Sequence, residues 1–591
     1  MARIGSGLWN RFRWLMVMAM TLLVVEMAPA ETIPTTPMLR LEGGMHTAII
    51  RRLAVDGRGK IAATVSDDKA LRIWSLPDGK MIKTLRVPIG TANDGKLFAV
   101  ALSPDGRLVA AGGWTGWDWE KKTTIYLMDV LTGKMVRRIG RLPNTINHLA
   151  FSPNGVFLAV AMARDNGIRI YRVQDGKQMV SDENYYDQTY WLNFDKSGQL
   201  VTTSYDGFIR LYDSSGILLR HRKFDNGKEP FSAVFSPDGA AIAVGFRNST
   251  QVEVLESRSL KTLFLPNIKG VDKKLQTVAW SKDGKYLFAA GLHQAGELRA
   301  VRRWENGGKG SYQDTPVSSD IIMDMATTPD GGLVFASGDP NLGRLDETGK
   351  LTFKHDRPQA DFRNMKELFR LSPDGHTFEF IYDPDRATIT RFSLDNMTLE
   401  HNSASREDLK PPLRTFNGVQ VQGVKDRQGV FINNISLPLK KMEHPSTYTI
   451  FHDGSHVLLG TNFSLRLYTK NGAELWEVPI PTQCWNVAVS QNGKVGMAAF
   501  GDGTIRWYQM QQGKEILAFF PHNDRQRWIL WNPLGYFTSS SKGDELLGWH
   551  LNQGLDSAAL FYPLGQFQGR YKNPLETLRL LREVEGNTNS Q

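Results

Sequence analysis

Few residues of this sequence are arranged for catalysis or metal binding. The single cysteine, Cys484, lies in the apolar run CWNVAV, which predicts a buried strand position and not an exposed nucleophile. His452 and His456 are four residues apart, but a turn separates them, so the helical spacing of a metal site does not apply. We find no phosphate loop, dinucleotide fingerprint or nucleophile elbow. We therefore predict no enzyme activity, no catalytic residue, no metal and no cofactor.

One structural unit recurs along most of the sequence. An apolar strand is followed by a turn of the type Ser-Pro-Asp-Gly, a second apolar strand, a polar turn and a strand such as IRIW or IRLY. Proline fixes φ, Asp or Asn binds its own backbone and glycine accepts positive φ, so each motif predicts a hairpin turn. The full turn occurs at residues 103–106, 152–155, 236–239 and 372–375.

The turn glycines from Gly59 to Gly535 recur about every 43 residues, the length of one four-stranded β-propeller blade. About twelve blades are recognisable, which exceeds one propeller of 4–8 blades. We therefore predict an all-β fold of two tandem rings of six or seven blades. The polar, aperiodic segment 305–319 suggests the boundary, giving rings at residues 31–310 and 311–574 and a short tail at 575–591.

The first blade carries four residues with a specific spacing. Asp68 precedes Trp74 by six residues. His46 opens the blade, and Thr64 lies between His46 and Asp68. This set resembles the Asp-His-Ser/Thr-Trp hydrogen-bonded tetrad of WD repeats. Other blades keep only the six-residue spacing, with Tyr in place of Trp, at Asp165 and Tyr171, Asp206 and Tyr212, and Asp502 and Tyr508. The resemblance implies WD-type architecture over roughly residues 40–555 and says little about function.

Two groups of tryptophans are candidates for interaction. Trp114, Trp117 and Trp119 occupy an insertion in the second blade; they could form an exposed anchor or fold back over the blade edge. The second group belongs to the C-terminal stretch 528–574, which resembles the C-terminal motif of bacterial WD-repeat proteins associated with caspase-like peptidases. The peptidase domain itself is absent from this sequence. The signature residues are Trp528, Trp531, Gly535, Asp544, Trp549 and His550.

For this signature we favour a structural role, in which its tryptophans pack the last blade and tie down the C-terminal tail, over a docking edge. A competing resemblance concerns Tyr468 to Trp476 (YTKNGAELW), which is similar to the repeat of quinoprotein propellers but is clear only once. It keeps open a propeller enzyme, quinoprotein-like or hydrolytic, with its site in a central funnel. A ligand sensor with a site in an inter-propeller cleft is also open.

The N-terminus predicts export. Arg3, Arg11 and Arg13 precede the apolar run 15–25, and Ala28-Pro29-Ala30 supplies small residues for cleavage before Glu31. One cysteine allows no internal disulfide, which suits a bacterial periplasm. The net charge of +10 is scattered, which favours an acidic partner and not a nucleic-acid footprint. We expect a periplasmic scaffold that binds partner proteins on its propeller faces, without stable membrane insertion after signal cleavage. The alternative is that the signal is not cleaved and serves as a membrane anchor.

Overall fold

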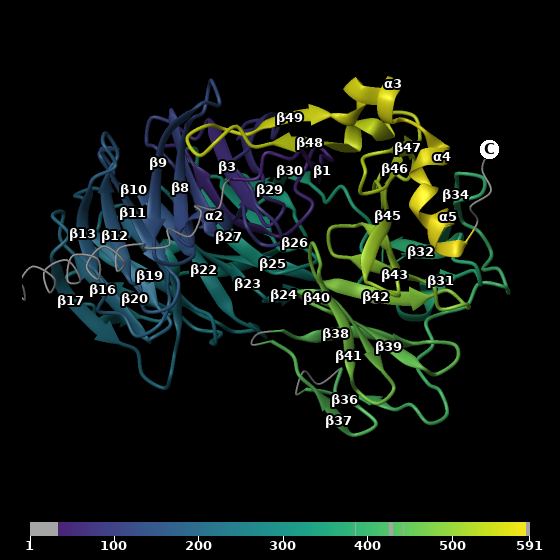
Figure 1. Cartoon of the computed structure of the whole chain (residues 1–591). Coiled ribbons are helices and arrows are strands. Elements are labelled where there is room, and N and C mark those ends of the chain that lie inside the picture. The colour runs from purple at the N-terminus through teal and green to yellow at the C-terminus, as the bar shows by residue number, and fades with distance from the viewer. Residues whose placement is uncertain (1–32, 364, 384–385, 425–428, 441–442, 587–591) are drawn as a thin grey trace, which may run out of the picture.

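The computed structural model describes residues 33–363, 365–383, 386–424, 429–440 and 443–586 (Figure 1). The predicted signal peptide and its cleavage site after Ala30 lie outside these residues. Twelve antiparallel sheets make up nearly all of the described chain, so the all-β fold of tandem WD-type propeller blades is confirmed. No helix within the described part of the chain is long and apolar enough to cross a membrane.

Residues 50–355 form a closed ring of seven blades, here called the ring. Blade 1 comprises β2 (Ile50–Val55), β3 (Ile61–Ser66), β4 (Leu71–Ser75) and β5 (Met81–Leu85); blade 2 comprises β6 (Lys96–Leu102), β7 (Leu108–Trp114), β8 (Thr123–Asp129) and β9 (Met135–Leu142), with α2 (Trp117–Glu120) inserted; blade 3 comprises β10 (Ile146–Phe151), β11 (Phe157–Met162), β12 (Ile168–Arg172) and β13 (Gln178–Asp182).

The remaining blades continue around the axis. Blade 4 comprises β14 (Thr189–Phe194), β15 (Leu200–Ser204), β16 (Phe208–Tyr212) and β17 (Leu218–Lys223); blade 5 comprises β18 (Pro230–Phe235), β19 (Ala241–Phe246), β20 (Val252–Glu256) and β21 (Thr262–Phe264); blade 6 comprises β22 (Leu275–Trp280), β23 (Leu287–Gly291), β24 (Gln294–Ala295), β25 (Leu298–Trp304), η1 (Asn306–Gly308) and β26 (Tyr312–Ser318); blade 7 comprises β27 (Ile322–Thr327), β28 (Leu333–Ser337), β29 (Leu342–Leu345) and β30 (Leu351–His355). The innermost strand of each blade contacts that of the next, and β27 returns to β2 and closes the ring.

The ring ends later than the sequence suggested. Segment 305–319, expected to separate two propellers, forms the hairpin between β25 and β26 in blade 6, where Trp304 pairs with Tyr312. A solvent-exposed outer hairpin has the same polar, turn-rich composition as a linker, which is why the two were confused. The expected division at residue 310 is therefore wrong, because blade 7 must follow before the ring can close.

The second half of the chain forms a row of four sheets, here called the arc. They are β31 (Arg370–Leu371), β32 (Thr377–Asp383), β33 (Arg386–Ser393) and β34 (Thr398–His401); β35 (Val421–Gln422), β36 (Val430–Ile432) and β37 (Ile435–Leu437); β38 (Pro445–Ile450), β39 (His456–Thr461), β40 (Ser464–Thr469) and β41 (Glu474–Pro479); and β42 (Cys484–Val489), β43 (Val495–Phe500), β44 (Ile505–Gln509), β45 (Lys514–Pro521), β46 (Trp528–Trp531) and β47 (Phe537–Ser539).

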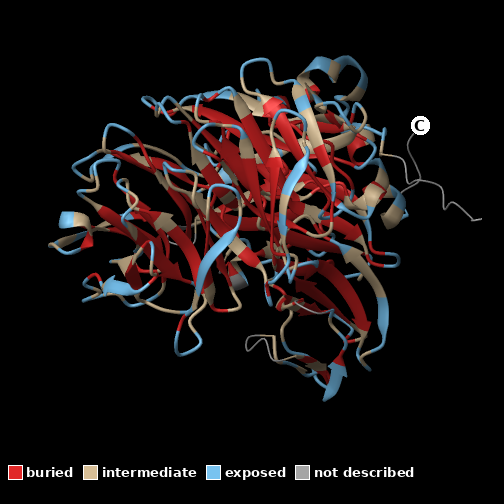
Figure 2. Ribbon diagram, turned by 90° about the vertical axis from the view of Figure 1, so that its left-hand side faces the viewer, coloured by how far each residue is buried: buried red, intermediate tan, exposed pale blue. Residues whose placement is uncertain are grey.

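Apolar clusters link the arc sheets in the order β35–β37, β38–β41, β42–β47 and β31–β34. The expected second ring of six or seven blades is not what the described residues form, since four arc sheets are too few for it. The irregular glycine spacing from Gly375 to Gly454 marks the place where the repeat breaks, at the short three-stranded sheet. Buried residues fill most inner strands of both parts, and exposed ones gather in the outermost strands and the loops (Figure 2).

The last repeat is split between two sheets. Its first two strands, β46 and β47, extend the β42–β45 sheet, whereas β48 (Leu547–Leu551) and β49 (Leu560–Pro563) pair with β1 (Met38–Leu41) from the other end of the chain (Figure 1). We call β1, β48 and β49 the junction sheet. The short helical elements are η2 (Lys366–Leu368), η3 (Gly543–Leu546), η4 (Leu564–Phe567), α3 (Gln568–Tyr571), α4 (Pro574–Thr577) and α5 (Arg579–Glu585).

The four tetrad residues of blade 1 form a buried hydrogen-bonded chain. Nε1–H of Trp74 donates to the Thr64 hydroxyl at 2.8 Å, and that oxygen lies 2.8 Å from Nε2 of His46. Nδ1 of His46 lies 2.9 Å from a carboxylate oxygen of Asp68. The chain therefore connects the turn after β3 to the packing surface between blades.

Replacing Thr64 with valine keeps the shape of the side chain but leaves two buried ring nitrogens without a partner. We expect a loss of about 2 kcal/mol in stability of the ring, measured as a lower midpoint of chemical unfolding. Thr352→Val on an exposed outer strand is the matched control. An unchanged midpoint for Thr64→Val would mean that the chain of hydrogen bonds is not stabilising.

The C-terminal helix α5 is held to the arc by His376. Its Nε2–H donates to Glu585 at 2.7 Å and its Nδ1–H donates to Asp395 at 2.8 Å. The hydrogen bond to Glu585 raises the pKa of His376 from 6.5 to about 9, although burial opposes the shift. A raised pKa adds stability at pH values below 6.5, and that stability is lost as the pH rises through about 9.

We expect His376→Gln to be less stable than the parent protein at pH 6 by about 1 kcal/mol, discounted because the histidine side chain is 22% exposed. The difference should vanish near pH 10. Thermal unfolding from pH 6 to 10 measures it, with the exposed His452→Gln as control. A constant difference across this range would contradict the role of the charged imidazole.

Candidate functional site

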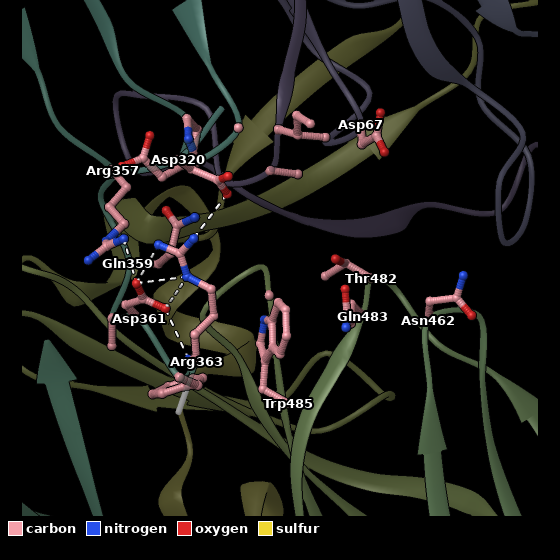
Figure 3. A pocket seen from close by; sticks show the side chains of 18 of the residues that line it. Asp67, Asp320, Arg357, Gln359, Asp361, Arg363, Asn462, Thr482, Gln483 and Trp485 are labelled. Carbon is pink, nitrogen blue, oxygen red and sulfur yellow. Dashed lines mark hydrogen bonds and ion pairs between the residues drawn. The ribbon is translucent and has the colours of Figure 1, made fainter. Parts of the chain in front are cut away.

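A cleft of about 380 Å³ separates the ring from the arc (Figure 3). On the ring side it is lined by the turns after β3 and β28 and by the loop before β27, which supply Asp67, Asp339 and Asp320. On the arc side, Asn462 follows β39 and Gln483 precedes β42. These are corresponding turns in each blade, so ring and arc present the same kind of edge to one another.

The linker between ring and arc crosses this cleft and is fixed by ion pairs. Arg363 donates to both carboxylate oxygens of Asp361 and also reaches Asp320 of the ring at 3.0 Å (Figure 3). Arg357 binds Asp361 at 2.8 Å. Burial alone would raise the pKa of Asp361, but the hydrogen bonds from Arg363 and the charge of Arg357 lower it. The linker is thereby fastened to the ring.

A second carboxylate of the cleft is fully coordinated by neutral donors. The hydroxyls of Ser318 and Ser337 donate to Asp339 at 2.7 and 2.6 Å, Ser319 donates to its other oxygen, and Asn341 does so at 3.1 Å. Although burial opposes it, these bonds lower the pKa of Asp339. A carboxylate held in this way is a poor proton acceptor, and it shapes the wall of the cleft instead.

The opposite wall is neutral. This wall consists of Thr482, Gln483 and Asn462, which lie opposite the ion pairs of the linker. The indole of Trp485 lies between the two walls (Figure 3). Of these side chains, tryptophan and arginine are the types that are enriched at protein interfaces. No group of three or more His, Cys, Asp or Glu side chains in the described parts of the molecule is placed to hold a metal ion.

A second cavity of about 350 Å³ adjoins the first and shares Ala48, Asp67 and Thr482 with it. Residues of β1 form one wall, and the tetrad turn of blade 1 forms another. The junction sheet therefore borders the cleft directly. Sequence reasoning did not single out any residue of β1.

Charged side chains of the inner strands connect blades across the ring. Arg52 of blade 1 extends to blades 4 and 5, where its guanidinium lies over the rings of Tyr190, Trp191 and Phe231 at 4.7, 5.1 and 5.5 Å. Asp324 accepts the backbone N–H of Leu53, and burial raises its pKa to about 6.

The other residues singled out from the sequence do not line the cleft; most of them pack within or between blades. Trp119 is buried, and Trp114 contacts Trp117 in a tilted arrangement with ring centroids 4.9 Å apart, so the insertion partly folds onto its own blade. Cys484 is buried and burial raises the pKa of its thiol. Trp476 donates to the carbonyl of Met510 at 2.7 Å and thus packs between two arc sheets.

The C-terminal signature lies on both sides of the split repeat. Trp528, Trp531, Asp544 and His550 are buried. Gly535 has φ 91°, and a Cβ atom there would lie 2.4 Å from the indole of Trp549. Burial and the nearby Arg86 lower the pKa of His550 to about 3. In this structure the signature packs the last repeat and holds β1.

Comparisons agree with these blades. Residues 39–75 and 136–172 match the WD domain, G-beta repeat. The first match runs from β1 to the end of β4, and the second runs from β9, the outer strand of blade 2, to the end of β12 in blade 3. The chain is 27% identical over 127 residues to the periodic tryptophan protein 2 homolog of Schizosaccharomyces pombe, covering 21% of this chain and 13% of that protein.

Two further relatives match over longer segments. Small ribosomal subunit protein RACK1 of Caenorhabditis elegans is 27% identical over 179 residues, covering 28% of this chain and 49% of that protein. An uncharacterized WD repeat-containing protein of Synechocystis is 26% identical over 153 residues, covering 26% and 41%. The chain thus spans less than half of each of these three relatives and resembles them through its WD repeats.

Arg363→Met should loosen the linker because it removes the contacts to Asp361 and Asp320. We expect a cost of about 1 kcal/mol and faster hydrogen exchange at residues 356–363, followed by mass spectrometry. Arg406→Met, which breaks an exposed pair with Asp408, is the control. Equal exchange in the two variants would show that the linker is held by other contacts.

Proposed function

We propose that this protein is a non-catalytic scaffold that binds partner proteins in the cleft between the ring and the arc. The observation that carries the proposal is the meeting of corresponding blade turns from both parts around one polar cleft. The charges of its linker wall are already fixed by ion pairs, so this wall can recognise a surface without rearranging.

The WD repeats support this proposal. Repeated blades supply a rigid frame, while the turns that border the cleft can vary without loss of the fold. The relatives named above are WD-repeat proteins, and one of them carries the description small ribosomal subunit protein. That assignment belongs to the relative.

The setting proposed is the bacterial periplasm, reached through a signal peptide cleaved after Ala30. Within it, the resemblance of residues 528–574 to a motif of peptidase-associated WD-repeat proteins makes a caspase-like peptidase one candidate partner. The net positive charge favours an acidic partner. Nucleic acid is not expected as a partner.

Two tryptophan variants separate the possible binding surfaces. Trp485 lies in the cleft, whereas Trp117 lies in the blade 2 insertion on α2. We expect the parent protein and Trp117→Ala to recover a partner in stoichiometric amount from a periplasmic extract, and Trp485→Ala to lose it at least tenfold. Quantitative mass spectrometry of the captured proteins measures this.

Thermal unfolding of each variant verifies that it is folded, and Gln483→Lys provides a second alteration of the cleft without removing an aromatic core contact. Loss with Trp117→Ala and retention with Trp485→Ala would place recognition at the insertion. Repeated failure to recover any partner, together with turnover of a small metabolite, would contradict the scaffold.

A further inference from the structure

Lys69 occupies a backbone conformation that suits glycine. It follows the tetrad residue Asp68 in the turn between β3 and β4, with φ 68°. In blade 4 and in the β42–β47 sheet, the residue after the corresponding aspartate is Gly207, with φ 88°, and Gly503, with φ 78°. Left-handed φ is unfavourable for a residue with a Cβ atom, so the same chain shows that glycine would fit this turn better.

The Lys69 side chain is also buried, with 4% of the residue exposed. Its ammonium group donates to the carbonyl of Gly90 at 3.1 Å and forms no ion pair with any residue that the structure describes. Burial lowers the pKa of Lys69 well below its usual range, and Arg40 and Lys96 lower it further. A buried, strained lysine that lacks a carboxylate partner is unfavourable for stability.

Two more cations adjoin Lys69 and lack partners. The guanidinium of Arg40, on β1, makes no hydrogen bond or ion pair within the described chain, and its Nε atom is buried. The ammonium group of Lys96, on β6, likewise has no described hydrogen-bond or ion-pair partner. Arg40 and Lys69 line the second cavity, and Lys96 lines the adjoining cleft.

The acidic groups near these cations are bound elsewhere. Asp67 receives two hydrogen bonds from Arg51, at 2.7 and 2.8 Å. Asp68 belongs to the tetrad, and Asp94 accepts the backbone N–H groups of Gly116 and Asp118. Asp502 and Glu515 are both paired with Arg506. These carboxylates moderate the local charge without reaching the three cations.

We propose that Arg40, Lys69 and Lys96 bind a carboxylate of an acidic segment of a partner protein at the junction of the two cavities. This inference rests on the proposed scaffold function and specifies its ligand chemistry. A singly charged carboxylate suits the site better than a doubly charged phosphate, because Asp67, Asp68 and Asp502 lie close by. The incoming carboxylate supplies the partner that the three cations lack.

The substitution Lys69→Gly separates binding from stability. It removes the buried charge and relieves the left-handed strain, so we expect a higher melting temperature together with at least tenfold weaker binding of a ten-residue polyglutamate peptide. Lys542→Gly is the matched control, because Lys542 is an exposed lysine with φ 58°. The Lys542→Gly variant also loses one positive charge, and it should bind polyglutamate as tightly as the parent protein does. Isothermal titration of the full-length protein measures binding.

Inorganic phosphate and polylysine are the comparison ligands. Binding of polyglutamate by the parent protein, with little binding of either comparison ligand, supports the proposal. Equal affinity of Lys69→Gly and the parent protein, or binding of phosphate without polyglutamate, overturns it. Arg40→Met is a second variant, expected to weaken polyglutamate binding at least fivefold, and unchanged affinity in it also counts against the site.

The two proposals can fail separately. If partner capture depends on Trp485 but polyglutamate does not bind, the scaffold function stands and the acidic ligand is wrong. If polyglutamate binding depends on Lys69 but no partner is captured, the site stands and the scaffold function is wrong.

Discussion

The pairing of β1 with β48 is the interaction on which the arrangement of ring and arc depends. It joins Met38 to His550 and Leu41 to Leu547, across about 500 residues of chain. Closing so long a loop is entropically costly, so the pairing needs support beyond its own backbone hydrogen bonds. That support comes from both sides. Glu42, next to β1, binds Arg72 and Arg86 of the ring, and Asn552, next to β48, donates to the carbonyls of Pro34 and Ile89.

The junction sheet explains why the C-terminal signature is so rich in glycine and tryptophan. Gly535 must leave room for the indole of Trp549, and Gly548 lies against the ring of Phe561, which also stacks on Arg86 of the ring. Larger residues at the two glycines would push the junction sheet away from blade 1. The signature therefore acts on the cleft indirectly, since it sets the position of β1 and with it the position of Arg40.

The sequence predicted the local features well and the large-scale closure poorly. Turn glycines and the spacing from Asp68 to Trp74 report on hydrogen bonds within one blade, and these patterns are visible in a short window. Which blade closes on which depends on contacts such as β27 with β2, which leave no local pattern. The ion pair between Arg363 and Asp320 carried no sequence signal either, because Asp320 lies 43 residues before it. Lys69 did carry one, since DDKAL stands where other blades have Asp-Gly.

The tetrad of blade 1 is connected to the cavities between ring and arc through the turn that contains Asp68 and Lys69. In blade 4, Tyr185 and Tyr212 replace the histidine and tryptophan, and their hydroxyls lie 2.9 Å apart, so a blade can be held together without the original set. Blade 1 has the original set, and there Asp68 also accepts the backbone N–H groups of Thr47, before β2, and Ala70, in the turn itself. A turn fixed in this way can keep Lys69 in an unfavourable conformation, whereas a loosely held turn would relax and withdraw it. The complete tetrad of blade 1 thus fixes the turn that places Lys69 beside the second cavity.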